Sequence, residues 1–188
     1  MVILVLAACG SPSGSAAGGA PAPLPVLPPR PLAQVFVLEA SGAAPEDTVV
    51  TVTPGAARVI VLRRSAPDFG LFATLDLRPG SDTAVAARSG PTTDVTLQPT
   101  PGLYSLTLAF QGTVADSATI SFSYGTHFVA PAGARERYGS NLAFEKALAI
   151  GRVGDDGVVT FLPTTRPGSD IVRAPLSGPG RYLVAAPR

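Results

Sequence analysis

His127 is the first residue to examine for chemistry, because histidine is the side chain best suited to acid–base catalysis and zinc binding near neutral pH. It is the only histidine among the 188 residues. The sequence also lacks a Gly-x-Ser-x-Gly nucleophile elbow, a His-Glu-x-x-His helix and a phosphate-binding glycine loop. We therefore expect no catalytic residue, no cofactor and no metal, and we interpret His127 as structural.

Carboxylates leave two further kinds of site open. The chain has 13 Asp and Glu residues, so a carboxylate pair of the kind that hydrolyses glycosides remains an alternative. Asp155 and Asp156 could bind Ca²⁺ if Asp170 folded over them. A tight hairpin explains the same residues more simply, because Asp156 is followed by Gly157 and glycine supplies the positive φ of such a turn.

The charged stretch at residues 135–141 is the candidate binding surface. Arg135 and Arg137 can donate to carboxylate or phosphate groups, and the Tyr138 ring can form an apolar platform beside Asn141. The alternative is a solvated segment at the start of a helix.

Cys9 is the only cysteine, so the chain cannot form an internal disulfide. It follows an apolar run at residues 2–8, which as a helix would be about 10 Å long, whereas the hydrocarbon core of a bilayer is about 30 Å thick. The run therefore predicts a signal-peptide core and not a membrane span. No Lys or Arg precedes it, which suggests a start further upstream; the alternative is a buried strand.

Residues 6–9, Leu-Ala-Ala-Cys, resemble the lipobox of bacterial lipoproteins. The resemblance implies that residues 1–8 are a signal peptide, that cleavage occurs before Cys9, and that the Cys9 thiol carries a diacylglyceryl lipid. Residues 9–33 are rich first in Gly, Ser and Ala and then in Pro, which predicts a flexible and then semi-rigid tether between a bacterial membrane and the body.

The rest of the sequence predicts short antiparallel strands separated by Pro and Gly turns. Apolar residues alternate with polar ones at residues 69–77, 103–110 and 117–124. Further strands are expected at residues 35–38, 48–53, 58–62, 83–87 and 95–97. This spacing is typical of an all-β sandwich.

Residues 46–124 are similar to the Ig-like modules of bacterial exported proteins. The similarity rests on Thr-Val-Thr-Pro-Gly at residues 51–55 and on Pro-Gly-Leu-Tyr at residues 101–104. It implies an antiparallel Ig-like β-sandwich at residues 34–124, with Tyr104 as a structural tyrosine corner that bonds back to the main chain.

Residues 125–188 repeat part of this pattern. Pro-Gly-Arg-Tyr at residues 179–182 makes Tyr182 a second tyrosine corner, and the segment resembles the end of a transthyretin-like sandwich. A second small β domain and an extension of the first remain alternatives. We expect one helix at residues 140–150, with Ser140 or Asn141 as its N-cap and Gly151 as its stop.

Together these features predict a lipid-anchored, non-catalytic cell-envelope protein with a structural or protein-binding role, whose partners are membrane lipid and an envelope protein or polysaccharide. Net charge is +1 and the arginines are scattered, which argues against nucleic acid. A carbohydrate-binding module is an alternative that the absence of Trp disfavours. A small hydrolase is the other alternative.

Overall fold

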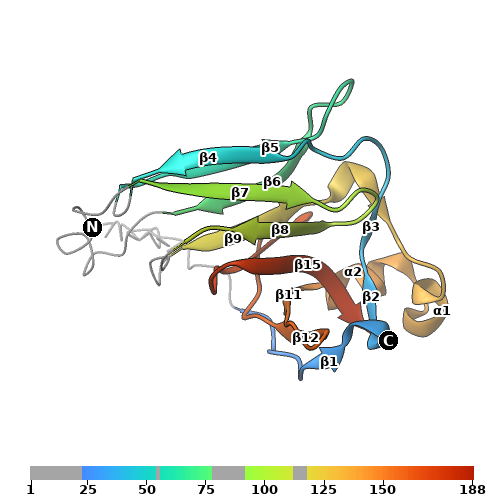
Figure 1. Cartoon of the computed structure of the whole chain (residues 1–188). Coiled ribbons are helices and arrows are strands. Elements are labelled where there is room, and N and C mark those ends of the chain that lie inside the picture. Colours follow the sequence, from blue (N-terminus) through green and yellow to red (C-terminus); the bar gives the residue numbers. More distant parts are fainter. Residues whose placement is uncertain (1–22, 54–55, 78–91, 112–117) are drawn as a thin grey trace, which may run out of the picture.

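Two antiparallel sheets pack face to face as a β-sandwich, which confirms the predicted all-β class (Figure 1). The computed structural model describes residues 23–53, 56–77, 92–111 and 118–188. Cys9, the apolar run before it and the strand expected at residues 83–87 lie outside the described residues. No described helix is long and apolar enough to cross a bilayer.

Antiparallel pairing joins the strands within each sheet. The larger sheet has the order β1 (Arg30–Pro31), β12 (Val158–Phe161), β11 (Ala149–Val153), β15 (Gly180–Pro187), β8 (Ser105–Ala109), β7 (Thr93–Pro99) and β4 (Thr48–Val52), and β2 (Val35–Val37) also pairs with β15. The five-stranded sheet has the order β13 (Thr165–Gly168), β14 (Ile171–Pro175), β9 (Thr119–Ser123), β6 (Leu71–Asp76) and β5 (Val59–Arg63).

Short elements close one end of the sandwich. Strands β3 (Glu39–Ala40) and β10 (Phe128–Val129) form a two-stranded pair, and helices α1 (Ala134–Tyr138) and α2 (Asn141–Ala147) follow β10. The 3₁₀ turns η1 (Leu32–Gln34) and η2 (Gly125–His127) precede β2 and β10. Figure 1 shows both helices at the same end of the molecule as the C-terminus.

The segment after residue 125 contributes strands to both sheets. Strand β14 pairs with β9, and β15 lies between β11 and β8. Strands from residues 125–188 and from residues 34–124 therefore share sheets and a common core.

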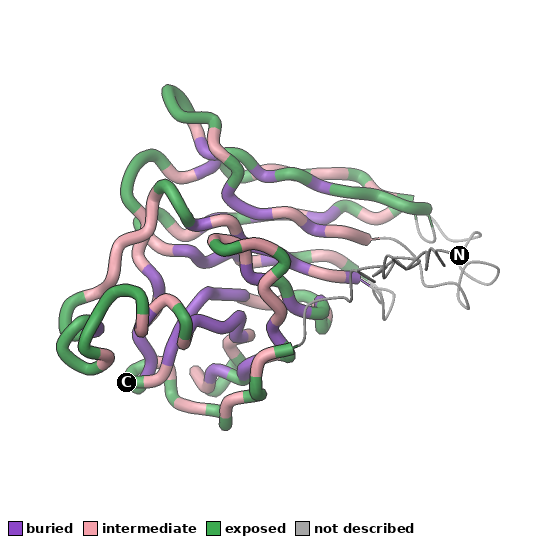
Figure 2. Tube along the Cα trace, turned by 180° about the vertical axis from the view of Figure 1, so that it is seen from behind, coloured by how far each residue is buried: buried purple, intermediate pink, exposed green. Residues whose placement is uncertain are grey.

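The main core lies between the sheets, and Figure 2 shows buried residues in both of them. In β9, Ile120 and Phe122 are completely buried, whereas Thr119 and Ser123 are half-buried. Tyr104 and Leu106 also point inward and are completely buried. Because side chains alternate with period two in a strand, this local pattern fixes which face is buried.

A second, smaller core lies on the other face of the larger sheet. Val159 and Leu183 are buried there beneath Leu27 and Leu32. The Leu24 amide donates to the Thr164 carbonyl at 2.6 Å, and Arg30 pairs with Val159. Residues 9–33 were predicted to form a tether. Residues 24–33 instead lie against the body, because Leu27 and Leu32 cover this core.

The alternation predicted for residues 69–77 is wrong at its start. Phe69 and Leu71 were expected on the same face as Leu75, but they are 59% and 37% exposed, whereas Phe72 and Ala73 are both buried. The pairing of β6 with β5 shifts register between Ala73 and Leu71, where β6 has one extra residue. Side chains that precede this shift therefore point to the opposite face of the sheet from the one that strict alternation predicts.

The helix expected at residues 140–150 is shorter, and residues 134–138 form a helix of their own. Ser140 is the N-cap of α2, as predicted, and its hydroxyl accepts from the Ala143 amide at 3.1 Å. The helix ends at Ala147 because Leu148 has extended backbone, and Gly151 is a strand residue. Packing on the sheet overrides the local helical preference here.

Candidate binding surface and the His127 cluster

Helix α1 presents the predicted binding residues to solvent. Gly133 and Gly139 flank this five-residue helix with φ values of +79° and +76°, which glycine adopts without strain. Arg135 and Arg137 are exposed on it. Asn141 is exposed at the start of α2. Three of the four predicted binding residues are therefore available to a partner.

Tyr138, the fourth residue, is turned toward the body. Its ring makes an edge contact with Phe36 at a centroid distance of 6.5 Å and a tilted contact with Phe144 at 5.6 Å. Its hydroxyl donates to the Pro187 carbonyl at 2.6 Å. Burial raises the pKa of Tyr138, and the charges of Arg137 and Arg30 oppose that shift. Tyr138 thus fixes α1 to the sandwich and lies near Arg137 and Arg30.

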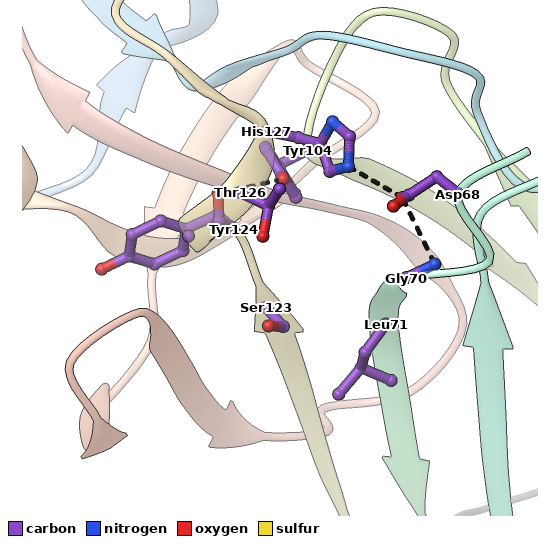
Figure 3. A pocket seen from close by; sticks show the side chains of 9 residues that line it. Asp68, Gly70, Leu71, Tyr104, Ser123, Tyr124, Thr126 and His127 are labelled. Atoms are coloured by element: carbon purple, nitrogen blue, oxygen red, sulfur yellow. Dashed lines mark hydrogen bonds and ion pairs between the residues drawn. The ribbon is translucent and has the colours of Figure 1, made fainter.

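His127 joins two other segments of the chain through its imidazole. Nε2 lies 2.7 Å from Asp68 Oδ2 (Figure 3). Nδ1 lies 3.4 Å from Ser41 Oγ. The Ser41 amide also donates to the His127 carbonyl at 3.1 Å. If Nε2 carries the proton and donates to Asp68, Nδ1 is free to accept from Ser41.

This Ser–His–Asp set has the residue types of a nucleophile, a base and an orienting carboxylate. A small cavity of about 80 Å³ adjoins it, lined by residues that include Asp68, Tyr104 and His127 (Figure 3). Ser41 does not line this cavity. A substrate in the cavity would therefore contact the side of the imidazole that faces Asp68 and would not reach the Ser41 hydroxyl. The arrangement is better suited to holding two loops together than to acyl transfer.

A buried arginine lies behind this cluster. Arg64 is 2% exposed, and its guanidinium carbon lies 5.4 Å from the Phe72 ring centroid and 5.3 Å from that of Tyr104. Its Nη atoms donate to the Ser41 carbonyl at 3.0 Å, to the Ala43 carbonyl at 3.3 Å and to the Tyr104 hydroxyl at 2.8 Å. Arg64 thus holds the loop that carries Ser41 against the core.

The two predicted tyrosine corners bond differently. The Tyr104 hydroxyl accepts from Arg64 and donates to the Tyr124 carbonyl at 3.3 Å, and burial raises its pKa. The Tyr182 hydroxyl donates to the Gly178 carbonyl at 2.6 Å, four residues earlier in the chain. Both rings are completely buried. Tyr182 therefore closes a local turn, whereas Tyr104 joins distant segments.

A second arginine network fixes α2 to the sandwich. Arg166 donates to the Tyr124 hydroxyl at 2.6 Å and to the carbonyls of Glu145 and Leu148 at the end of α2. The Tyr124 hydroxyl in turn donates to Glu145 Oε1 at 3.3 Å. Burial raises the pKa of Tyr124 to about 12 although Arg166 opposes the shift. Tyr124 therefore stays protonated and acts as a neutral link.

Sequence reasoning did not find the Ser41–His127–Asp68 cluster or the arginine networks. His127 lies 86 residues from Ser41 and 59 from Asp68, and no motif links such distant positions. Within the described part of the chain, no group of three or more His, Cys, Asp or Glu side chains could hold a metal ion. Comparisons with protein-family models, curated proteins and solved structures give no match.

Proposed function

We propose that the protein is a lipid-anchored component of a bacterial cell envelope and that its body has a structural or protein-binding role without catalysis. The observation that supports a binding role is the surface of α1 and the start of α2. Arg135, Arg137 and Asn141 are exposed there, while Tyr138 fixes the helix to the core. A preorganised polar surface on a rigid element lowers the entropy cost of binding.

The lipid anchor is supported by the lipobox-like sequence that ends at Cys9 and by the Pro-rich residues that follow it. We expect intact mass spectrometry of protein extracted from membranes of its native host to give a chain that begins at Cys9 and carries two or three acyl chains, because one chain alone holds a protein only marginally. A Cys9→Ala variant should remain unacylated and should leave the membrane fraction. An unmodified Cys9 in a chain that retains Met1 would remove the anchor from the proposal.

A small serine hydrolase is the second candidate function, and the Ser41–His127–Asp68 cluster is the observation that favours it. Under the leading proposal, we expect a fluorophosphonate probe to leave Ser41 unlabelled, because Ser41 does not line the adjacent cavity. A known serine hydrolase in the same reaction serves as the positive control. Labelling that disappears in both Ser41→Ala and His127→Ala variants would replace the leading proposal with the hydrolase.

A further inference from the structure

Cations from several segments of the chain gather where α1 and α2 close the sandwich. We call this surface the basic end and define it by five residues: Arg30, Arg135, Arg137, Lys146 and Arg188. Arg30 is half-buried, and the other four side chains are exposed. Because the net charge of the whole chain is only +1, this concentration of cations is a local feature.

Three of these arginines lie near one pair of aromatic rings. The guanidinium carbon of Arg137 lies 6.0 Å from the Tyr138 ring centroid, and that of Arg188 lies 4.9 Å from the Phe36 ring centroid. The two rings are themselves in edge contact. Arg30 is close enough to act electrostatically on the Tyr138 hydroxyl. The arginines therefore surround one aromatic pair, although they come from separate parts of the chain.

The cations of the basic end have no ion-pair partner within the part of the chain that the structure describes. None of the five forms a salt bridge with a described Asp or Glu side chain. Glu145 accepts from the Tyr124 hydroxyl, which leaves Glu136 as the exposed acidic side chain of the two helices. A surface of unpaired cations favours an anionic partner.

An apolar side chain lies among these cations. Leu142 is 59% exposed, one helical turn before Lys146 on α2. Exposed leucine beside arginine and lysine is the composition of surfaces that lie in the headgroup region of a membrane, where the cations meet phosphates and the apolar group enters the acyl boundary.

The chain that arrives from Cys9 enters the body close to these helices. The Leu24 amide bonds to the Thr164 carbonyl, and the Thr164 hydroxyl accepts from the Ile150 amide, three residues after the end of α2. Fourteen residues separate Cys9 from Leu24 in the sequence, and extended chain spans at most about 3.3–3.6 Å per residue. A lipid on Cys9 would therefore keep Leu24 within about 50 Å of the membrane.

We propose that the basic end binds the phosphate groups of anionic phospholipids in the membrane that holds Cys9. The body then lies on the bilayer, so the surface that supports a binding role above has the membrane itself as its partner. This inference rests on the proposed lipid anchor for its location, but the binding chemistry belongs to the side chains of the basic end alone.

The test uses the full chain with Cys9→Ser, so that binding does not depend on acylation. We expect it to cosediment with vesicles that contain phosphatidylglycerol more strongly than with pure phosphatidylcholine vesicles. Any binding by the apolar residues 2–8 should be common to both vesicle types. An Arg135→Gln/Arg137→Gln variant should lose about 30-fold in affinity for the anionic vesicles, since each basic residue near such a surface contributes about 1 kcal/mol.

The matched control is an Arg58→Gln/Arg173→Gln variant, which should bind like the parent. It removes the same charge from two exposed arginines, Arg173 in β14 and Arg58 just before β5. Equal losses in both variants, or no preference for anionic vesicles, would overturn the proposal. Binding to soluble polyphosphate but not to vesicles would overturn it in favour of a phosphate-bearing polymer. Acylation of Cys9 is measured separately, so the anchor and the membrane contact can fail independently.

Discussion

Replacement of Arg64 by alanine will lower the free energy of unfolding by about 3–5 kcal/mol. The side chain is 2% exposed and lies against the rings of Phe72 and Tyr104. Its loss leaves a cavity beside those two rings, which stack on each other. It also removes the donor for the Tyr104 hydroxyl and for the Ser41 carbonyl, and a buried polar group without a partner is costly.

Urea unfolding followed by circular dichroism measures this effect, and two variants separate its causes. Arg64→Met fills most of the space but cannot donate, so it should recover only the cavity contribution, about 1–2 kcal/mol. Arg63→Ala removes the neighbouring exposed arginine, which donates once to the Phe69 carbonyl, and should change stability by about 0.5 kcal/mol or less. If Arg64→Met were as stable as the parent, the hydrogen bonds of Arg64 would contribute nothing net.

Replacement of Arg166 by alanine will lower the free energy of unfolding by about 2–4 kcal/mol. Three donors would be lost at once: one to the Tyr124 hydroxyl and two to the carbonyls of Glu145 and Leu148. The Leu148 carbonyl would lose this donor, whereas the Glu145 carbonyl would keep the Leu148 amide. A cation at the end of a helix also interacts favourably with the helix dipole. We therefore expect the Arg166→Ala substitution to destabilise α2 more than the rest of the molecule.

Hydrogen exchange in α2, measured together with urea unfolding, tests this second expectation. The amides of α2 should lose protection more than those of β9 in the Arg166→Ala protein, because the network fixes the helix and not the strand. Arg173→Ala serves as the control, since Arg173 is exposed and bonds to Ser121 alone. Uniform loss of protection across the molecule, with no excess in α2, would contradict the assigned role.

The strand pattern could be predicted because it depends on neighbouring residues. Alternation at residues 117–124 identified the buried face of β9, and Asp156-Gly157 identified the hairpin between β11 and β12. In that hairpin Gly157 has a φ of +74°, and Asp156 Oδ1 accepts from the Val158 amide at 2.9 Å. Turn residues and alternation act within a few positions, so a sequence reports them directly.

Features that depend on tertiary packing could not be predicted in the same way. The irregular pairing of β6 with β5 reversed the exposure of Phe69 and Leu71, and the pairing of β11 with β15 ended α2 before Leu148. Arg64 gave no signal of burial, since arginine is rarely buried and its partners are distant carbonyls and rings. The candidate surface at Arg135 and Arg137 was found because its residues are adjacent in the sequence.

The place of β15 at the centre of the larger sheet has a consequence for the order of folding. This strand follows the other described strands in the sequence, yet it pairs with β11, β8 and β2, and Val35 pairs with Pro187 in the last of these pairings. During synthesis, β2 and β8 are made long before β15. The larger sheet therefore stays incomplete between β11 and β8 until β15 has been made. Pairings between segments so distant in the sequence form slowly, so we expect completion of the larger sheet to be a slow step in folding.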